Sequence, residues 1–223
     1  MKKIPCCALF TLLLSAVGVH AAAPTNNFAR WEKEISAFER ADQTNPPPHH
    51  VILFTGSSGI RLWKTLAQDF PEHRVINRGF GGSQIADATH FADRIIFPYA
   101  PRLIVLRAGG NDIHAGKSPE RVAADFKDFV AKVRTKYPDI KIIFVGMNHT
   151  LARLKNREKE QLANTLIADY IKQTSGLTFI ATSAHYVGPD DLPRADLLAT
   201  DKLHFSPAGY KILTDLLKPA LAP

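Results

Sequence analysis

Short apolar runs alternate with amphipathic segments along most of the chain. Each run is rich in valine, isoleucine, leucine or phenylalanine and is followed by glycine or polar residues. Continuous apolar runs of this kind are typical of strands that are buried on both faces of a sheet. We therefore predict strands over residues 51–54, 75–77, 103–106, 142–145 and 177–180.

Between these runs, apolar residues recur at the spacing of one face of a helix. Ser118 before Pro119 and Ser206 before Pro207 are typical helix starts, because serine caps a helix and proline fits its first turn. The predicted helices cover residues 28–41, 83–97, 119–133, 162–171 and 207–217. Strands that alternate with helices predict an α/β fold with a parallel sheet covered on both faces. Its ligand site is expected at the carboxyl ends of the strands.

Residues 1–23 have the three-part pattern of a secretory signal peptide. Lys2 and Lys3 precede an uncharged apolar run over residues 8–19, and small residues follow at 21–23. The run is shorter than the ~20 residues that span a bilayer. We expect a signal peptide over 1–23 and a single domain over 24–223 without an integral membrane segment. The mature protein would be secreted or periplasmic.

Charge and cysteine content narrow the classes of function. The chain has 28 lysines and arginines against 21 aspartates and glutamates, a net charge of +7, and the basic residues are scattered. Scattered charge is typical of a solvated surface, so we expect no nucleic-acid partner. The two cysteines, Cys6 and Cys7, fall in the predicted signal peptide. The mature chain then has no thiolate nucleophile or cysteine metal site, and we expect neither a metal nor a cofactor.

Ser58 is the first candidate for chemistry. It follows the strand predicted at 51–54, and Gly56 and Gly59 around it permit a tight turn into a helix. A serine at this place can also cap the helix, and a glycine- and serine-rich loop before a helix can bind an anion. Ser57 is the rival nucleophile.

Asp201 and His204 form the second candidate, just before the helix start at Ser206. Imidazole is the usual base for a serine hydroxyl, and a carboxylate on its other nitrogen fixes the tautomer. An aspartate three residues before the histidine can reach the ring if the loop makes one turn. The alternative is an exposed loop pair without a catalytic role.

Gly82 and Asn111 form the third candidate, each after a predicted strand of its own. A backbone N–H and a side-chain amide can stabilise a developing oxyanion. Ordinary turn chemistry also favours glycine and asparagine at such places. Other residues could line the same cleft, with packing or solvation as the favoured interpretation: Arg61, Trp63, Arg107 and His149.

Together these elements resemble the SGNH hydrolases, also called the GDSL esterase/lipase family. The resemblance extends over about residues 51–218 and rests on four blocks that contain Ser58, Gly82, Asn111 and the pair Asp201 and His204. It implies a three-layer α/β/α sandwich with a flavodoxin-like parallel sheet of about five strands. It also implies Ser58 as nucleophile and His204 as general base, oriented by Asp201. The oxyanion hole would consist of the Ser58 N–H, the Gly82 N–H and the Asn111 side chain.

The function implied by the resemblance is a secreted serine ester hydrolase that forms an acyl-enzyme on Ser58. Its substrate would be an ester in a small molecule, a lipid or an acylated glycan, and the lack of a long apolar lid segment favours short acyl groups. Ser57 stands where the family has aspartate, which leaves the local role of that aspartate open. The alternative function is a non-catalytic protein that binds an anion, a flavin or a carbohydrate on the same fold.

Overall fold

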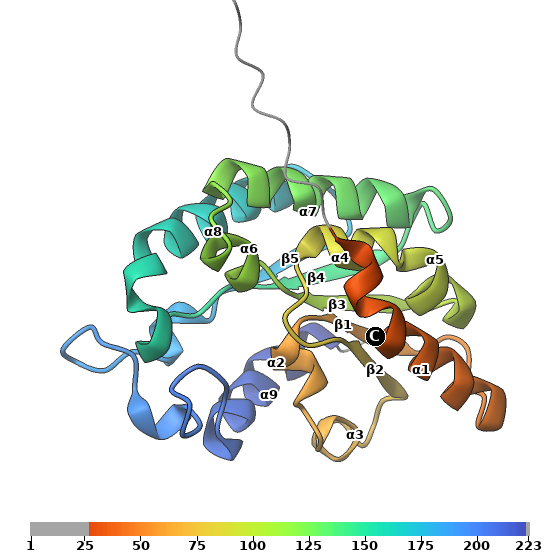
Figure 1. Ribbon diagram of the computed structural model, residues 1–223, viewed down its shortest axis with the longest axis horizontal. Helices are drawn as coiled ribbons and strands as arrows, with labels where there is room; N and C mark the ends of the chain where they lie inside the picture. The colour runs from red at the N-terminus through yellow and green to blue at the C-terminus, as the bar shows by residue number, and fades with distance from the viewer. Residues whose placement is uncertain (1–26, 222–223) are drawn as a thin grey trace, which may run out of the picture.

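A five-stranded parallel sheet lies at the centre of the protein (Figure 1). The computed structural model describes residues 27–221. The sheet has the order β2-β1-β3-β4-β5, with strands β1 (Ile52–Gly56), β2 (Val75–Gly79), β3 (Leu103–Arg107), β4 (Lys141–Val145) and β5 (Leu177–Ile180). The strand order reverses between β1 and β3, where doubly wound sheets open a crevice for a ligand. The predicted fold class is confirmed.

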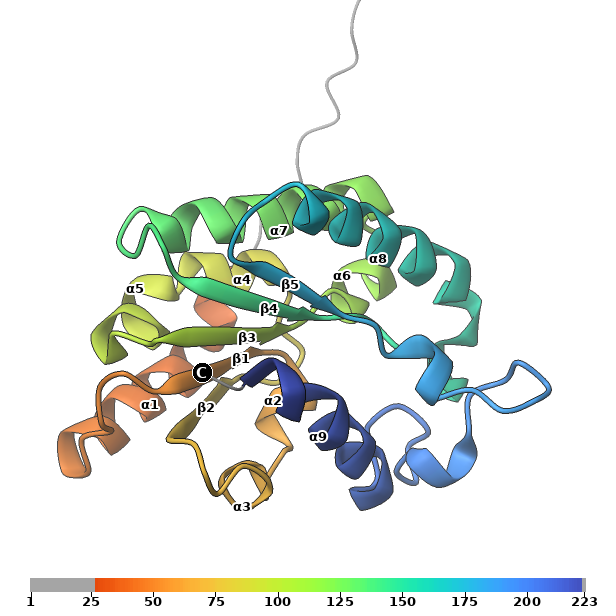
Figure 2. The same cartoon turned by 180° about the vertical axis from the view of Figure 1, so that it is seen from behind.

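Helices cover both faces of the sheet and give three layers (Figures 1 and 2). One face carries the 3-10 helix η1 (Phe28–Trp31) and the α-helices α1 (Glu32–Thr44), α4 (Ile85–His90), α5 (Ala92–Ile95), α7 (Pro119–Arg134) and α8 (Arg157–Lys172). The other face carries α2 (Ser58–Arg61), α3 (Leu66–Asp69) and α9 (Pro207–Leu221). Helix α6 (Gly110–His114) follows β3, and the remaining elements are 3-10 turns, η2 (Phe97–Tyr99), η3 (Leu151–Asn156), η4 (Ser183–His185) and η5 (Ala195–Leu197).

Successive residues of each strand face opposite layers, as the pleat of a strand requires. In β1, Leu53 packs into the cluster on the α1, α4 and α7 side, whereas Ile52 and Phe54 pack into the cluster on the α2 and α9 side. All three side chains are fully buried. Because both faces of such a strand are buried, its successive residues are apolar, and the strand forms a continuous apolar run in the sequence.

The predicted helices differ from the structure mainly at their ends. The segment 83–97 is divided into α4 and α5 at Phe91, whose ψ of 7° departs from helical backbone. Helix α5 ends at Ile95, and Pro98, which has no N–H to continue an α-helix, lies in the 3-10 turn that follows. Helix α9 runs beyond residue 217 to Leu221, and both Leu217 and Leu221 are fully buried. Helix α8 begins at Arg157 rather than at 162.

The predicted signal peptide over 1–23, with Cys6 and Cys7, lies outside the described residues. Within residues 27–221, no helix is both long enough and apolar enough to cross a membrane.

Candidate active site

The turn after β1 places Ser58 at the carboxyl edge of the sheet. Gly56 has a φ of +123°, and a Cβ there would lie 2.1 Å from the carbonyl oxygen of Arg107 in β3. Only glycine fits this close approach. The chain turns directly into α2, of which Ser58 is the first residue. Because β1 and β3 are neighbours, the residues that follow them face one crevice.

Ser58, His204 and Asp201 form one chain of hydrogen bonds. The Ser58 hydroxyl lies 2.8 Å from His204 Nε2, and His204 Nδ1 lies 2.6 Å from Asp201 Oδ2. The His204 side chain is 25% exposed and the Asp201 side chain is 50% exposed, so the pair lies at the rim of the crevice. When Nδ1 donates its proton to Asp201, Nε2 is free to accept the proton of the Ser58 hydroxyl.

The loop that carries this pair is held by its own hydrogen bonds. Asp201 Oδ1 accepts from the backbone N–H groups of Leu203 and His204, each at 2.9 Å. Lys202 has a φ of +56°, in the left-handed region that a lysine seldom adopts, and this turn brings the carboxylate back to the ring. Hydrogen bonds from the His204 ring and from the two N–H groups lower the pKa of the Asp201 carboxyl to about 2. The carboxylate is therefore ionised at neutral pH.

Neither serine of the first block caps α2 through its side chain. Ser57 is the N-cap residue, but its side chain accepts no hydrogen bond from the helix. The Ser58 hydroxyl is directed to His204 instead. The helix spans only Ser58–Arg61, which leaves little dipole for an anion at its start. Among the described residues, the imidazole is therefore hydrogen-bonded to Ser58 and not to Ser57.

Gly82 and Asn111 lie in two other segments, which follow β2 and β3. Asn111 lies in the first turn of α6, and its Nδ2 donates to the Ser83 carbonyl oxygen at 3.0 Å. Gly82 lies in the loop between β2 and α4, which is tied to the end of β1. Phe80 N and Ser83 Oγ both donate to the carbonyl oxygen of Gly56, at 3.0 and 3.1 Å. Among the described residues, none accepts a hydrogen bond from the Gly82 N–H.

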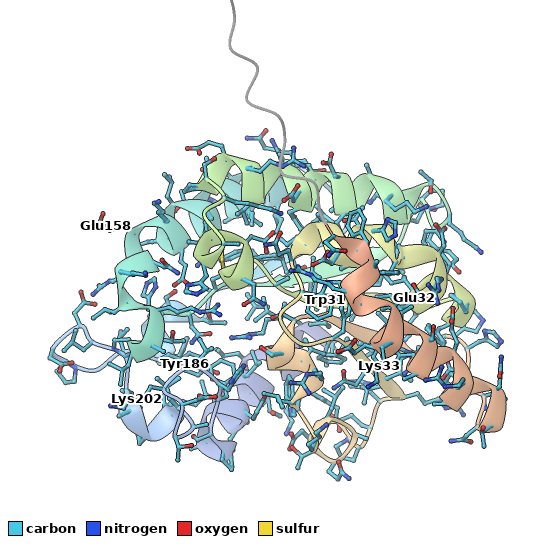
Figure 3. The ribbon with its side chains drawn as sticks, viewed as in Figure 1. Trp31, Glu32, Lys33, Glu158, Tyr186 and Lys202 are labelled. Atoms are coloured by element: carbon cyan, nitrogen blue, oxygen red, sulfur yellow. The ribbon has the colours of Figure 1, made fainter. Side chains whose placement is uncertain are left out.

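The aromatic end of η1 covers the loop that contains Gly82. Gly82 has a φ of +77°, and a Cβ there would lie 3.2 Å from the Trp31 ring, so both conformation and space favour glycine. Trp31 also packs edge-on against Phe80, with ring centroids 5.7 Å apart. Figure 3 shows Trp31 at the start of α1, beside this loop.

A buried ion network lies directly behind Asn111, and the sequence did not reveal it. Asp112 is fully buried and accepts from the Ile85 N–H at 3.3 Å and from Lys117 Nζ at 2.9 Å. Lys117 also donates to Asp125 at 2.6 Å. Burial raises the pKa of Asp112 to about 6, although the neighbouring Lys117 lowers it. The network joins the start of α4 to α6 and α7, and so fixes Asn111 relative to the loop of Gly82.

A cavity of about 70 Å³ opens beside the Ser58 hydroxyl. Ser58, His204 and Asn111 line it, whereas Gly82 is not among its lining residues. No sequence motif marks several other polar residues of the wall: Asn148, Thr150, Arg153 and Glu160.

The four further candidates from the sequence have different places. Arg107 lines the cavity. His149 is buried behind it, with its Nδ1 3.2 Å from Glu160 Oε2. Trp63 is a core residue with 1% exposure, and the Arg61 side chain lies against Gly81. No cluster of three or more histidine, cysteine, aspartate or glutamate side chains in the described part of the chain could hold a metal ion.

The chain belongs to the GDSL-like Lipase/Acylhydrolase family, which matches residues 54–212 and therefore spans all five residues of the predicted site. This confirms the resemblance stated above and makes the chain a hydrolase of the lipase and acylhydrolase class. No curated protein matches the chain.

Solved structures share the fold at low sequence identity. A proposed platelet activating factor from Streptococcus pneumonia is 20% identical with a TM-score of 0.78, and the match covers 87% of this chain and 94% of that one. A GDSL-like lipase from Bacteroides thetaiotaomicron is 20% identical with a TM-score of 0.66, over 87% and 96% of the two chains. An acetyl-xylooligosaccharide esterase from Geobacillus stearmophilus, in a mutant form, is 17% identical with a TM-score of 0.61, over 79% and 96%. These matches establish the fold.

Proposed function

We propose that the protein is a serine ester hydrolase in which Ser58 is the nucleophile, His204 the general base and Asp201 the residue that orients the imidazole. The observation that carries this proposal is the hydrogen-bond chain from the Ser58 hydroxyl through His204 to Asp201, in a chain of the GDSL-like family. A serine hydroxyl is a weak nucleophile alone and needs such a base.

The reaction has two halves. His204 Nε2 takes the Ser58 proton while Ser58 Oγ attacks the ester carbonyl, and the resulting imidazolium is stabilised by the Asp201 carboxylate. His204 then gives its proton to the leaving alcohol, and the acyl group stays on Ser58. A water molecule, deprotonated by His204, attacks the acyl carbon, and the free acid leaves as the proton returns to Ser58.

The tetrahedral intermediates carry a negative oxygen that needs hydrogen-bond donors. We assign this role to the Ser58 N–H, the Gly82 N–H and the Asn111 amide. The Ser58 N–H belongs to the first turn of α2 and has no partner within the helix. The second proton of Asn111 Nδ2 can face the crevice, since the first is used by the Ser83 carbonyl.

The substrate we propose is an ester with a short acyl group. The cavity beside the Ser58 hydroxyl is small, about 70 Å³, which favours a short acyl group. One of the solved structures with this fold is named an acetyl-xylooligosaccharide esterase, which makes acylated glycans a reasonable class to test. Small-molecule and lipid esters are the other classes.

We also propose that the protein is exported. The basic start, the apolar run and the small residues over 1–23 support this. Mass spectrometry of the protein from its own host should find a mature start after Ala21 or Ala23. An intact Met1 on protein confined to the cytoplasm would overturn the proposed export.

Hydrolysis of p-nitrophenyl esters of increasing chain length tests the activity. Acetate and propionate esters should be cleaved fastest. Ser58→Ala should lower kcat by several orders of magnitude, about 10,000-fold or more, because a triad acts as a unit. Ser57→Ala is the matched control and should keep substantial activity. A swapped result would make Ser57 the nucleophile. Wild-type protein that binds glycans, anions or flavin and cleaves no ester would favour the non-catalytic alternative.

A further inference from the structure

Arg107 is a positive charge that forms no salt bridge within residues 27–221, and it lies in the wall of the cavity beside Ser58. It ends β3, and its Nη1 lies so close to Gly59 that a Cβ there would be 1.8 Å away. Its Nη2 donates to Asn148 Oδ1 at 2.6 Å, and its Cζ lies 4.5 Å from the centre of the Phe205 ring. Within residues 27–221 the hydrogen bond to Asn148 is the only one that this side chain makes.

Two residues of the cavity wall each hold a buried hydrogen-bond donor that has no partner among residues 27–221. The donors are Arg107 Nε and the Thr150 hydroxyl. Burial lowers the pKa of Arg107, because the guanidinium has lost water, but an arginine stays charged in a protein. Leaving a buried charged donor unpaired costs stability. A ligand that brings a negatively charged acceptor would satisfy both donors.

The other charged groups of the wall already have protein partners. Arg153 Nη1 donates to Asn111 Oδ1 at 2.9 Å, and Glu160 Oε2 lies 3.2 Å from His149 Nδ1. These two charges are opposite in sign. The Glu160 carboxylate interacts electrostatically with both Arg107 and Arg153, so these three groups together leave one net positive charge in the wall.

The position of Arg107 indicates which half of an ester it would meet. The leaving alcohol takes its proton from His204 Nε2 and must depart past the partly exposed imidazole. The acyl group stays on Ser58, and the cavity of about 70 Å³ beside that hydroxyl is where it would lie. Arg107 lines this cavity, so its guanidinium is the charge that the far end of a short acyl group would meet there.

We propose that the enzyme prefers esters whose short acyl group ends in a carboxylate, such as the half-esters of dicarboxylic acids, and that Arg107 and the Thr150 hydroxyl bind this carboxylate. The inference rests on the proposed function and names the substrate class of the same site.

Two matched pairs of esters test whether a terminal carboxylate is preferred and whether it must lie on the acyl side of the ester. Monomethyl succinate and methyl levulinate share one acyl chain and differ in a terminal carboxylate against a methyl ketone. Acetoxyacetate and acetoxyacetone place the same difference on the alcohol side. The rate of acid release, followed by titration at constant pH, gives kcat/KM for each ester in wild-type protein and in Arg107→Gln, Arg107→Lys and Arg102→Gln. Within each variant, kcat/KM of the charged ester is divided by that of its neutral partner, so a general loss of activity cancels.

In wild-type protein the succinate half-ester should exceed methyl levulinate by about tenfold or more in kcat/KM, the effect of one good charge-assisted contact. Arg107→Gln should bring this ratio close to one, and Arg107→Lys should keep part of it, because lysine retains the charge without the planar fork. Arg102→Gln removes an exposed arginine just before the other end of β3 and should leave the ratio unchanged.

A wild-type ratio of one or less would overturn the inference, and so would an undiminished ratio in Arg107→Gln. A preference confined to the acetoxyacetate pair would overturn the acyl-side assignment. If the neutral esters are cleaved in a Ser58-dependent manner without any preference, the inference fails and the proposed function stands. If none of the four esters is cleaved and Ser58 forms no adduct with an active-site phosphonate, both fail.

Discussion

Arg153 Nη1 donates a hydrogen bond to Asn111 Oδ1 at 2.9 Å. The same nitrogen donates to the Gly110 carbonyl oxygen at 3.3 Å. Because the amide oxygen of Asn111 is held by a guanidinium, its nitrogen must point the other way, toward the Ser83 carbonyl and the crevice. Arg153 therefore sets the orientation that a proposed oxyanion donor requires.

Replacement of Asn111 should lower kcat more than it raises KM, because the oxyanion forms only after attack. Asn111→Ala removes the donor and should reduce kcat by about 100- to 1,000-fold. Asn111→Asp preserves the shape and can still pair with Arg153, but it presents a negative charge to the oxyanion and should be at least as damaging. Steady-state kinetics with p-nitrophenyl acetate give both constants.

Arg153→Met is the companion variant, since it leaves Asn111 in place but frees its amide. Its loss of kcat should be smaller than that of Asn111→Ala. Full activity in Asn111→Asp would exclude this residue as an oxyanion donor.

The pH dependence of hydrolysis should report the imidazole and not the carboxylate. The pKa of Asp201 is about 2, so this carboxyl stays ionised across the range in which the enzyme can be assayed. Acidification should therefore lower kcat/KM with a slope of one proton, because the general base must be unprotonated and Asp201 adds no second proton. A pH–rate profile from acid to neutral pH measures this slope, and an acid limb steeper than one proton would show that a second group must be ionised.

Asp201→Asn should cut kcat steeply, because an amide can hold the imidazole in the wrong tautomer. We expect a loss of about 10- to 1,000-fold, smaller than for a buried triad, because the Asp201 side chain is half exposed. The variant should still fold, which circular dichroism and a cooperative urea transition would show. An unchanged kcat in a folded variant would remove Asp201 from the mechanism.

Asp112 should make the stability of the protein depend on pH between about 4 and 6. Its pKa is raised from 3.8 to about 6 in the folded state, so the folded protein binds this proton more tightly than the unfolded chain does. The contribution of Asp112 is then fully present below pH 3.8 and is lost as the pH rises through about 6.

Urea unfolding of wild-type protein and of Asp112→Asn measures this contribution. The free energy of unfolding of wild-type protein, relative to the variant, should decrease as the pH rises through that window. Asp128→Asn removes an exposed carboxylate from α7 and should show the wild-type dependence. If the free energy of unfolding of wild-type protein, relative to Asp112→Asn, increased with pH, the raised pKa of Asp112 would be contradicted.

Much of the fold could be predicted because strands that are buried on both faces appear in the sequence as continuous apolar runs. Residues 103–106 are apolar without interruption, and β3 is indeed buried on both faces. Helix α7 also follows local chemistry, since Ser118 Oγ accepts from the Arg121 N–H and Pro119 begins the helix. The division at Phe91 could not be foreseen, because the apolar spacing continues across it.

The residues of the candidate site were predictable to different degrees. Ser58, Asp201 and His204 stand in short motifs next to strand ends and helix starts, and it is their combination with Gly82 and Asn111, rather than any one motif, that predicts them. The wall of the cavity has no such signal. Arg107 is the polar end of an apolar strand, and Thr150 and Glu160 come from η3 and α8 regions far along the chain, so only the folded structure brings them together. Asp112 and Lys117 likewise reveal their ion pair only through burial.

The most direct test of the central claim is to identify the residue that carries a covalent adduct after reaction with a fluorophosphonate. This reagent modifies a serine only where a base activates the hydroxyl and donors stabilise the oxyanion. Intact mass and peptide mapping of the mature protein should show one adduct, on Ser58. Labelling should be absent in Ser58→Ala, strongly slowed in a folded His204→Ala variant and retained in Ser57→Ala. An adduct on another residue, or no adduct on wild-type protein that is correctly folded, would contradict the account.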